Sequence, residues 1–330
     1  MINKEEASVN WTTSGSAIVV VAIALAGMAA TPAHAQAKRT FVSALSGNDA
    51  NDCSRPTPCR TFAGALGKTA AGGVIDVLDP GGYSSVTINK SISIVADGGG
   101  DAGILVSAGS TGITISAGLG DKIILRGLTI EGAGGGDTGI RFWSGQSLII
   151  ENCVVRNHTG TGIAFQPNGG TAADLQVSNT MAAHNGIYGI MIFPSGAGLA
   201  LKATLNQVKM YSNDSAGLRV SGLTSASGTI NVTVLDSVAA SNAGDGLGVD
   251  SAVAGGATAN LMVARTGVLN NHSFGVQAYG SLATARVRES IITGNGTGVA
   301  IASGGTLLSY KDNSIDANGT DGSSAQISLK

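Results

Sequence analysis

The sequence predicts an all-β solenoid, in which one short unit of strands and bends repeats along a single axis, and three observations indicate this fold. Glycine makes up 50 of the 330 residues and only 12% of the residues are charged, which favours strands and turns over helices. A phrase in which an asparagine stands four residues before a glycine recurs along the chain. An apolar run follows each glycine, and its apolar side chains alternate with the period of two that a half-buried strand requires.

The first 35 residues are expected to be an export signal. Residues 17–30 form a short apolar run, and the small-x-small sequence at 33–35 predicts cleavage between Ala35 and Gln36. The run is shorter than the ~20 residues that a membrane-spanning helix needs, so no membrane span is predicted in the mature protein. We therefore expect an exported protein, located in the periplasm or outside the cell.

The chain is expected to comprise three segments. Residues 1–35 form the signal peptide, residues 36–83 form an N-terminal cap and residues 84–330 form the solenoid. Nothing in the sequence has the composition of a linker between domains. The formal net charge is −2 and no basic stripe is present, which argues against nucleic acid as a partner.

The cysteines predict one disulfide and one free thiol. Cys53 and Cys59 stand six residues apart with two prolines between them, so a disulfide is favoured in an exported chain. Cys153 lies alone in an apolar run that resembles a strand. We expect it to be a buried and unreactive thiol.

The repeat has a length of 23 to 29 residues, measured between successive marker glycines that follow the asparagine. A period of this size with strand-like alternation is typical of a β-helix. Ser85 takes the place of the glycine in the first copy. The marker glycines are Gly112, Gly139, Gly162, Gly189, Gly217, Gly246, Gly275 and Gly298.

The residues one and three positions after each marker are apolar in every copy and are predicted to line the core. In the last copy they are Val299 and Ile301. A second strand is expected before each asparagine, with core residues eight and three positions before it. For Asn157 these are Ile149 and Val154. Each coil therefore contains at least three short strands separated by bends.

The recurring asparagine is predicted to adopt the left-handed backbone conformation of a sharp bend and to hydrogen-bond with the asparagine of the next coil, as one rung of a ladder. His158, His184 and His272 stand beside these bends and are expected to be solvated turn residues. A polar row six positions before the asparagines is interpreted as a second bend and a stacked charge ladder with a structural role. Its members are Glu151, Asn179, Gln207, Asp236, Arg265, Glu289 and Asp312.

The N-terminal segment is expected to cap the solenoid, whose end coil otherwise exposes core residues and unpaired strand edges. The cap should contain a strand, the disulfide loop and a short helix near residues 61–70. Phe62, Ala65 and Leu66 lie on one face of this helix. The short polar tail after Asn318 leaves the other end thinly covered.

These coils, the Val/Ile rows and the opening sequence FVSALSGNDANDC…PCRTFAGAL at 41–66 resemble exported bacterial right-handed parallel β-helix proteins of the pectin-lyase-like superfamily. The resemblance covers residues 39 to about 320 and implies a right-handed parallel β-helix of about nine coils. The superfamily contains polysaccharide lyases, glycoside hydrolases, uronan epimerases and adhesins. Their catalytic motifs, such as an Asp-Asp pair or Asp-Pro-His, are absent from this chain. The resemblance therefore leaves open whether the protein is an enzyme.

The residues two and four positions after the markers point away from the core, and their aromatic members form one outward column. Because positions on successive coils share a face, Trp143, Phe193 and Tyr279 should lie near polar residues that suit a sugar ring and its hydroxyls. The alternative is that loops fold over these aromatic side chains and bury them. The candidates for carbohydrate binding are Arg141, Trp143, Gln166, Phe193, Arg219, Asp250, Gln277 and Tyr279.

The weak catalytic candidates are Asp250, Arg219 and Tyr279, which are expected on neighbouring strands. A carboxylate, an arginine and a phenol could remove a proton beside a uronate, as a polysaccharide lyase does. A simple ion pair beside a tyrosine is the favoured interpretation, and a glycoside hydrolase would need a second carboxylate on this face. Asp250 alone does not make a site for a hard cation, so neither a metal nor another cofactor is predicted.

Two hypotheses for function remain. In the first, the protein binds, and also processes, a polysaccharide or cell-envelope glycan along the outward column. In the second, it is a non-catalytic surface, structural or adhesin-like protein that contacts a protein partner or the cell envelope. The exposure of Trp143, Phe193 and Tyr279 discriminates between them, because buried rings cannot bind a sugar.

Overall fold

The computed structural model describes residues 1, 36–98, 100–252 and 254–328. Residues 36–330 form one compact unit. The predicted signal peptide and the site before Gln36 where it would be cleaved lie outside the described residues, apart from Met1. Within these ranges, no helix is both long and apolar enough to cross a membrane.

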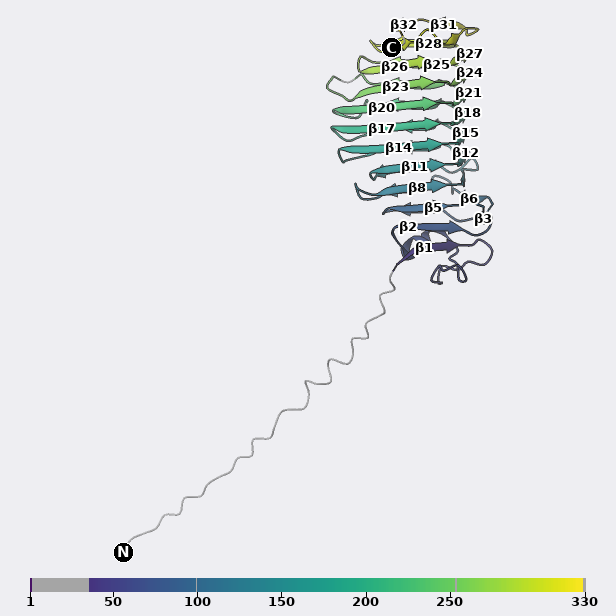
Figure 1. Cartoon of the computed structure of the whole chain (residues 1–330), viewed down its shortest axis with the longest axis vertical. Helices are drawn as coiled ribbons and strands as arrows, with labels where there is room; N and C mark the ends of the chain where they lie inside the picture. Colours follow the sequence, from purple (N-terminus) through teal and green to yellow (C-terminus); the bar gives the residue numbers. More distant parts are fainter. Residues whose placement is uncertain (2–35, 99, 253, 329–330) are drawn as a thin grey trace. The chain divides into compact units, whose positions relative to one another are not determined.

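The chain winds into a parallel β-helix, in which each coil contributes one strand to each of three parallel sheets (Figure 1). This confirms the predicted all-β solenoid of about nine coils. Sheet A stacks β1 (Ala37–Val42), β2 (Thr69–Val77), β5 (Ile92–Val95), β8 (Lys122–Arg126), β11 (Ser147–Glu151), β14 (Ala172–Ser178), β17 (Leu199–Asn206), β20 (Gly228–Leu235), β23 (Thr258–Ala264), β26 (Ala283–Arg288), β29 (Thr306–Ser309) and β32 (Ala325–Gln326).

The other two sheets have shorter strands. Sheet B stacks β3 (Gly81–Gly82), β6 (Ala102–Leu105), β9 (Leu128–Glu131), β12 (Val154–Arg156), β15 (Met181–Ala183), β18 (Lys209–Tyr211), β21 (Val238–Ala240), β24 (Gly267–Leu269), β27 (Ile291–Thr293) and β30 (Ser314–Ile315). Sheet C stacks β4 (Val86–Ile88), β7 (Thr111–Ser116), β10 (Thr138–Ser144), β13 (Ile163–Phe165), β16 (Tyr188–Ile192), β19 (Ala216–Ser221), β22 (Leu247–Asp250), β25 (Phe274–Tyr279), β28 (Thr297–Ala302) and β31 (Thr320–Gly322).

The residues after the marker glycines line the core of sheet C, as predicted, with one exception. Their register is regular, because Ile140 pairs with Ile163, which in turn pairs with Ile190. The exception is Ile301, which is 44% exposed. The next strand, β31, ends at the level of Val299, so no paired strand of the described residues covers Ile301.

The bend between sheets B and C corrects the predicted role of the asparagine. The left-handed residue is the one before it, for example His184 before Asn185 and Ser212 before Asn213. The asparagines themselves are buried and form the predicted ladder. The Asn185 Nδ2 donates to the Asn213 Oδ1 at 2.9 Å, and the Asn213 Nδ2 donates to the Asn242 Oδ1 at 2.9 Å. The bend therefore divides the two tasks between two adjacent residues.

His158, and not Asn157, occupies the ladder position in its coil. The His158 N–H donates to the Asn185 Oδ1 at 3.4 Å, as the Asn185 N–H donates to the Asn213 Oδ1, whereas Asn157 is the left-handed residue. The expectation of a solvated His158 is therefore wrong, since its side chain is only 2% exposed. Burial lowers the pKa of His158 from 6.5, because the charged imidazolium is poorly solvated there.

The same one-residue shift affects the rest of that coil. Ile150, and not Ile149, pairs with Val177 in sheet A, and Val155, and not Val154, pairs with Ala182 in sheet B. Ile150 and Val155 are fully buried, whereas their sequence neighbours Ile149 and Val154 are half-buried.

The second bend lies between sheets A and B. Asn152, and not Glu151, is the left-handed residue of its coil, and Lys311, and not Asp312, is left-handed in the last one. In the five coils between, the residue of the predicted bend row has a left-handed backbone, as at Asp236 and Arg265. Arg265 binds Asp236 of the preceding coil with two hydrogen bonds, at 2.7 and 2.9 Å, which confirms part of the charge ladder.

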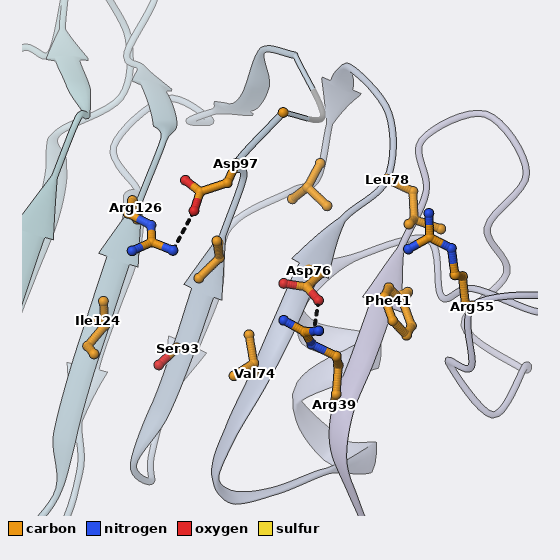
Figure 2. A pocket seen from close by; sticks show the side chains of 13 residues that line it. Arg39, Phe41, Arg55, Val74, Asp76, Leu78, Ser93, Asp97, Ile124 and Arg126 are labelled. Atoms are coloured by element: carbon orange, nitrogen blue, oxygen red, sulfur yellow. Dashed lines mark ion pairs between the residues drawn. The ribbon is translucent and has the colours of Figure 1, made fainter.

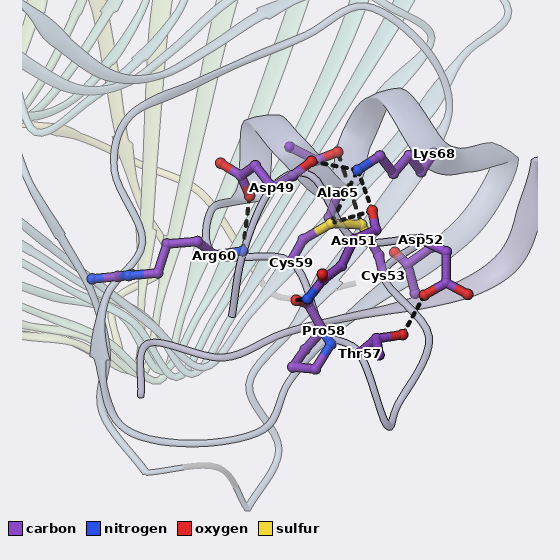
Figure 3. The surroundings of a disulfide bond; sticks show 12 residues. Asp49, Asn51, Asp52, Cys53, Thr57, Pro58, Cys59, Arg60, Ala65 and Lys68 are labelled. Atoms are coloured by element: carbon purple, nitrogen blue, oxygen red, sulfur yellow. Dashed lines mark hydrogen bonds between the residues drawn. A yellow bond between two sulfur atoms is a disulfide. The ribbon is translucent and has the colours of Figure 1, made fainter. Parts of the chain in front are cut away.

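The cap contains the helix and disulfide that were predicted. Helix α1 (Phe62–Lys68) starts after Thr61, whose hydroxyl accepts a hydrogen bond from the Gly64 N–H, and it buries Phe62, Ala65 and Leu66. Cys53 and Cys59 form the disulfide, and Lys68 donates to the main-chain carbonyls of Asp49 and Asn51, just before the disulfide loop (Figure 3). The segment before the loop is thus tied to the end of α1.

Cys153 is buried, as predicted. Desolvation raises the pKa of its thiol to about 11.

Candidate functional site

The outward residues two positions after the markers form one row on sheet C, because their strands are stacked in register. Arg141 on β10 is followed by Ala164, Met191, Arg219, Gly248 and Gln277 on successive strands, as the pairing of β10 to β25 shows. Of the row four positions after the markers, which holds the aromatic residues, Ser221, Asp250 and Tyr279 are paired in register. Trp143 departs from the predicted register. It is an extra residue in β10, because Ser116 pairs with Ser144 instead.

The aromatic side chains of the column differ in exposure. Trp143 and Tyr279 are each 38% exposed, whereas Phe193, which directly follows β16, is half-buried. The alternative in which loops bury all three rings is therefore wrong. Ser221 and Asp250, which lie between Phe193 and Tyr279 in the same row, are buried, so the row is exposed mainly at its two ends.

Arg141 and Trp143 form the first of these ends. The Arg141 guanidinium carbon lies 5.4 Å from the centre of the Trp143 ring system, a cation–π distance. The Arg141 Nη2 donates to the Asp137 carboxylate at 3.0 Å and to the Thr138 hydroxyl at 2.6 Å. These contacts hold the guanidinium against the ring. The indole is therefore held beside Arg141, and 38% of Trp143 stays exposed.

Arg219 organises the other end. Its Nε lies 2.9 Å from the Asp250 Oδ1, and its Nη1 lies 3.4 Å from both the Asp245 carboxylate and the Gln277 amide oxygen. The guanidinium can lie flat on the sheet because the intervening residue is Gly248. A Cβ at that position would stand 3.0 Å from the Arg219 Nη1.

Asp250 is enclosed by this arrangement. It is 2% exposed, and the Ser221 hydroxyl donates to its Oδ2 at 3.0 Å. Burial raises the pKa of Asp250 above its usual 3.8, although Arg219 and Ser221 act in the opposite direction. Tyr279 pairs with Asp250 in the register of β22 and β25. Among the described residues, no hydrogen bond joins Tyr279 to Asp250 or Arg219, so the three do not form a connected proton-transfer chain.

Gln166 lies beside the column at the start of the loop after β13. Its N–H donates to the Phe142 carbonyl at 2.9 Å, and its side-chain Oε1 is buried without a partner among the described residues. The side chain is half-buried, so it is less available to a ligand than Trp143 or Tyr279.

The sequence interpretation missed two carboxylates that complete the column. Asp137 stands four residues before Arg141, and Asp245 precedes a marker glycine one coil after Arg219. The first spacing is visible in the sequence. The second depends on the stacking of coils and needs the alignment of the whole repeat. In residues 36–98, 100–252 and 254–328, no group of three or more His, Cys, Asp or Glu residues is placed to hold a metal ion.

Comparison with known proteins defines the class of fold. The family model described as "Right handed beta helix region" matches residues 82–234, which establishes a right-handed parallel β-helix. Among solved structures, the pectate lyase Pel9A is similar with a TM-score of 0.55 and 18% sequence identity, over 88% of this chain and 77% of that one. This likeness extends the shared fold along most of the chain. No curated protein sequence matches.

Two other solved structures are more distant. XylC in complex with xylose has a TM-score of 0.48 and 10% identity, over 77% of this chain and 75% of that one. The A-module of the mannuronan C-5 epimerase AlgE4 of Azotobacter vinelandii has a TM-score of 0.44 and 14% identity, over 78% of this chain and 91% of that one.

Proposed function

We propose that this right-handed β-helix protein binds a polysaccharide along the outer face of sheet C. The observation that carries the proposal is the exposure of Trp143 and Tyr279 on one face, in a chain with only 4% aromatic residues. Aromatic faces contact the apolar faces of sugar rings, while the arginine and glutamine side chains beside them suit sugar hydroxyls. The shared fold with a pectate lyase supports the same class of ligand.

The spacing of the two rings favours an extended ligand. Five strand-to-strand steps separate β10 from β25 in sheet C, and each step is about 4.8 Å, so the rings stand roughly 24 Å apart. A single sugar cannot contact both. A linear chain of several sugars that runs along the solenoid axis can.

Binding without turnover is the form of this proposal that the contacts support. Asp250 would have to be a free carboxylate to act as a base, but it is buried and paired with Arg219 and Ser221. Asp245 also contacts Arg219, at 3.4 Å. The contacts of Arg219 therefore suit the positioning of side chains for binding better than they suit catalysis.

A second candidate function is assembly with a protein partner, and the C-terminal end of the solenoid favours it. Ile301 and Ile291 are 44% and 55% exposed there, and the last strands, β30 to β32, have only two or three residues each. Uncovered apolar side chains and short strands at the end of a solenoid are a surface on which a partner can pack.

Export belongs to the same proposal. The apolar run at 17–30 and the disulfide between Cys53 and Cys59 are both expected of a protein that matures outside the cytoplasm. N-terminal sequencing of the protein from its native host should start at Gln36. A start at Met1 would contradict export by cleavage of this signal.

The glycan proposal is tested by screening residues 36–330 on a glycan array and then titrating the best polysaccharide with variants. Trp143→Ala and Tyr279→Ala should each weaken binding at least tenfold. Tyr211→Ala is the matched control, because Tyr211 is a half-buried tyrosine on sheet B. The proposal fails if no glycan binds, or if both column variants bind as tightly as the control.

A further inference from the structure

Four asparagines of this chain stand directly before a glycine, and one of them differs from the others in its surroundings. They are Asn168, Asn185, Asn295 and Asn318. At such a pair the main-chain nitrogen of the glycine can attack the asparagine side chain, because glycine has no Cβ to obstruct the approach. This reaction makes asparagine a thermolabile residue. In a folded protein it requires that the side-chain amide and the glycine N–H are both free to move.

The asparagine ladder holds the side chains of Asn185 and Asn295. Both residues are buried, with 0% and 2% exposed. The Asn185 Nδ2 donates to the Asn213 Oδ1, and the Asn295 Nδ2 donates to the Asn318 Oδ1, each at 2.9 Å. Asn318 is half-buried in the same ladder. Attack on any of these amides would first have to break the ladder bonds.

The main-chain N–H that would attack is also bound at all three ladder pairs. The bonds join Gly186 to the His158 carbonyl at 2.8 Å, Gly296 to the Asn271 carbonyl at 3.1 Å, and Gly319 to the Asn295 carbonyl at 2.8 Å. Each of these glycine nitrogens is therefore turned toward the carbonyl of the preceding coil and away from the asparagine side chain. The ladder thus protects its own asparagines twice, at the side chain and at the main chain.

Asn168 lacks both kinds of protection. It lies in the loop 166–171 between β13 and β14, and both Asn168 and Gly169 are exposed. Among the described residues, neither the Asn168 side chain nor the Gly169 N–H has a hydrogen-bond partner. The Gly169 nitrogen also has space beside it, since a Cβ at Gly196 of the next loop would stand 3.0 Å from it. The glycine is required at this place, because its φ of 100° is one that other residues rarely adopt.

We infer that Asn168 is a site of spontaneous deamidation in the folded protein, with isoaspartate as a product. The Gly169 nitrogen forms a bond to the Asn168 Cγ and gives up its proton. The bond between Cγ and Nδ2 breaks, and the nitrogen leaves with that proton as ammonia, which produces a cyclic succinimide. Water then opens the ring at either of its carbonyls and yields aspartate or isoaspartate. Water is the only co-reactant, so the reaction needs no second protein.

The modified residue would lie beside the outward face of sheet C. The Asn168 N–H donates to the Trp143 carbonyl at 2.9 Å, so the new carboxylate arises at the end of the row where Trp143 lies. Isoaspartate also lengthens the main chain by one carbon atom, which a loop can accommodate more easily than a paired strand. Any effect of this charge on a polysaccharide rests on the function proposed above, whereas the reaction itself does not.

The inference is tested by incubating residues 36–330 at mildly alkaline pH, with and without urea, and measuring isoaspartate at each of the four asparagines by peptide mass spectrometry. In the folded protein, isoaspartate at Asn168 should accumulate at least tenfold faster than at Asn185 or Asn295. In urea the four rates should become similar, because the ladder is lost and every pair has the same chemical sequence. The three ladder pairs are thus controls within the same chain.

Two variants connect the reaction to the charge of the folded protein. Anion-exchange chromatography should show a more acidic form that grows with time. Asn168→Gln should abolish this form, because the longer side chain closes a ring much less readily. Asn231→Gln is the matched control, since Asn231 is an exposed asparagine on β20 that stands before a valine. It should leave the acidic form unchanged.

Three results would overturn the inference. The first is the absence of isoaspartate at Asn168 in the folded protein over a time in which it forms in urea. The second is equal accumulation at Asn168 and Asn185 in the folded protein, which would show that the ladder gives no protection. The third is an acidic form that persists in Asn168→Gln, which would place the reaction at another residue.

Discussion

Replacement of Asn213 by alanine should remove a large part of the stability of the solenoid. The Asn213 side chain is fully buried and makes four hydrogen bonds. Its Nδ2 donates to the Ala182 carbonyl and to the Asn242 Oδ1, and its Oδ1 accepts from the N–H and from the Nδ2 of Asn185. With a net contribution of about 1 kcal/mol for each bond, the free energy of unfolding should fall by about 4 kcal/mol.

The measurement is the midpoint of urea denaturation of residues 36–330, followed by circular dichroism, for the parent and two variants. Asn260→Ala is the matched control, because Asn260 is part of an exposed asparagine pair, with its Nδ2 3.2 Å from the Asn231 Oδ1. Asn260→Ala should lower the free energy of unfolding by less than about 1 kcal/mol. The ladder would have no stabilising role if Asn213→Ala and Asn260→Ala had equal midpoints.

Three further predictions concern the bends, the free thiol and the uncapped end. The pKa of His158 in the folded state lies below 6.5, so the unfolded state binds a proton at a higher pH than the folded state does. The free energy of unfolding should therefore fall as the pH decreases below about 6.5. His158→Asn should remove this part of the pH dependence. Cys153, with its pKa raised to about 11, should not react with iodoacetamide at pH 8 unless denaturant is present, as mass spectrometry can show. Ile301→Ser should change the free energy of unfolding by less than about 1 kcal/mol, whereas Ile192→Ser, in a buried position of the same row, should lower that free energy by more than about 2 kcal/mol. A large effect at Ile301 would show that another chain covers it.

The repeat made most of the fold predictable, because the strands of every coil obey the same two rules, one for which side chains face the core and one for the register with neighbouring coils. Apolar residues two apart must face the core, and their register is set by the coil above and below. This is why Ile140, Ile163 and Ile190 fall in one row in both the sequence and the structure. The exception, Ile301, depends on a coil that ends too early to cover it.

The errors in the bends have a physical cause. In one coil two hydrogen-bonding residues, Asn157 and His158, stand side by side, and the sequence pattern favours the asparagine. The structure places the histidine at the ladder position, where its main-chain N–H donates to the Asn185 Oδ1, and its two ring nitrogens are buried without a hydrogen-bond partner among the described residues. The preference of asparagine for the left-handed conformation is real, but it applies to the neighbouring position in the bend.

The outward column was predictable only in part. Alternation alone shows that Trp143 and Tyr279 point away from the core, and the structure shows that both are exposed. The burial of Asp250 and its contact with Arg219 depend on how side chains and loops pack over the sheet. Sheet A also carries a hollow that Arg39, Phe41 and Arg55 line, and this hollow depends on where the disulfide loop folds (Figure 2). The repeat pattern of the sequence gives no information about this loop.

The most direct test of carbohydrate binding on sheet C is the affinity of the double variant Trp143→Ala/Tyr279→Ala for the best polysaccharide from the array, measured beside Tyr211→Ala. If the two rings contact the same chain, the double variant should lose at least a hundredfold in affinity while both proteins keep the same circular dichroism spectrum and unfolding midpoint. Equal affinity of the double variant and the control would contradict binding of a polysaccharide along this face.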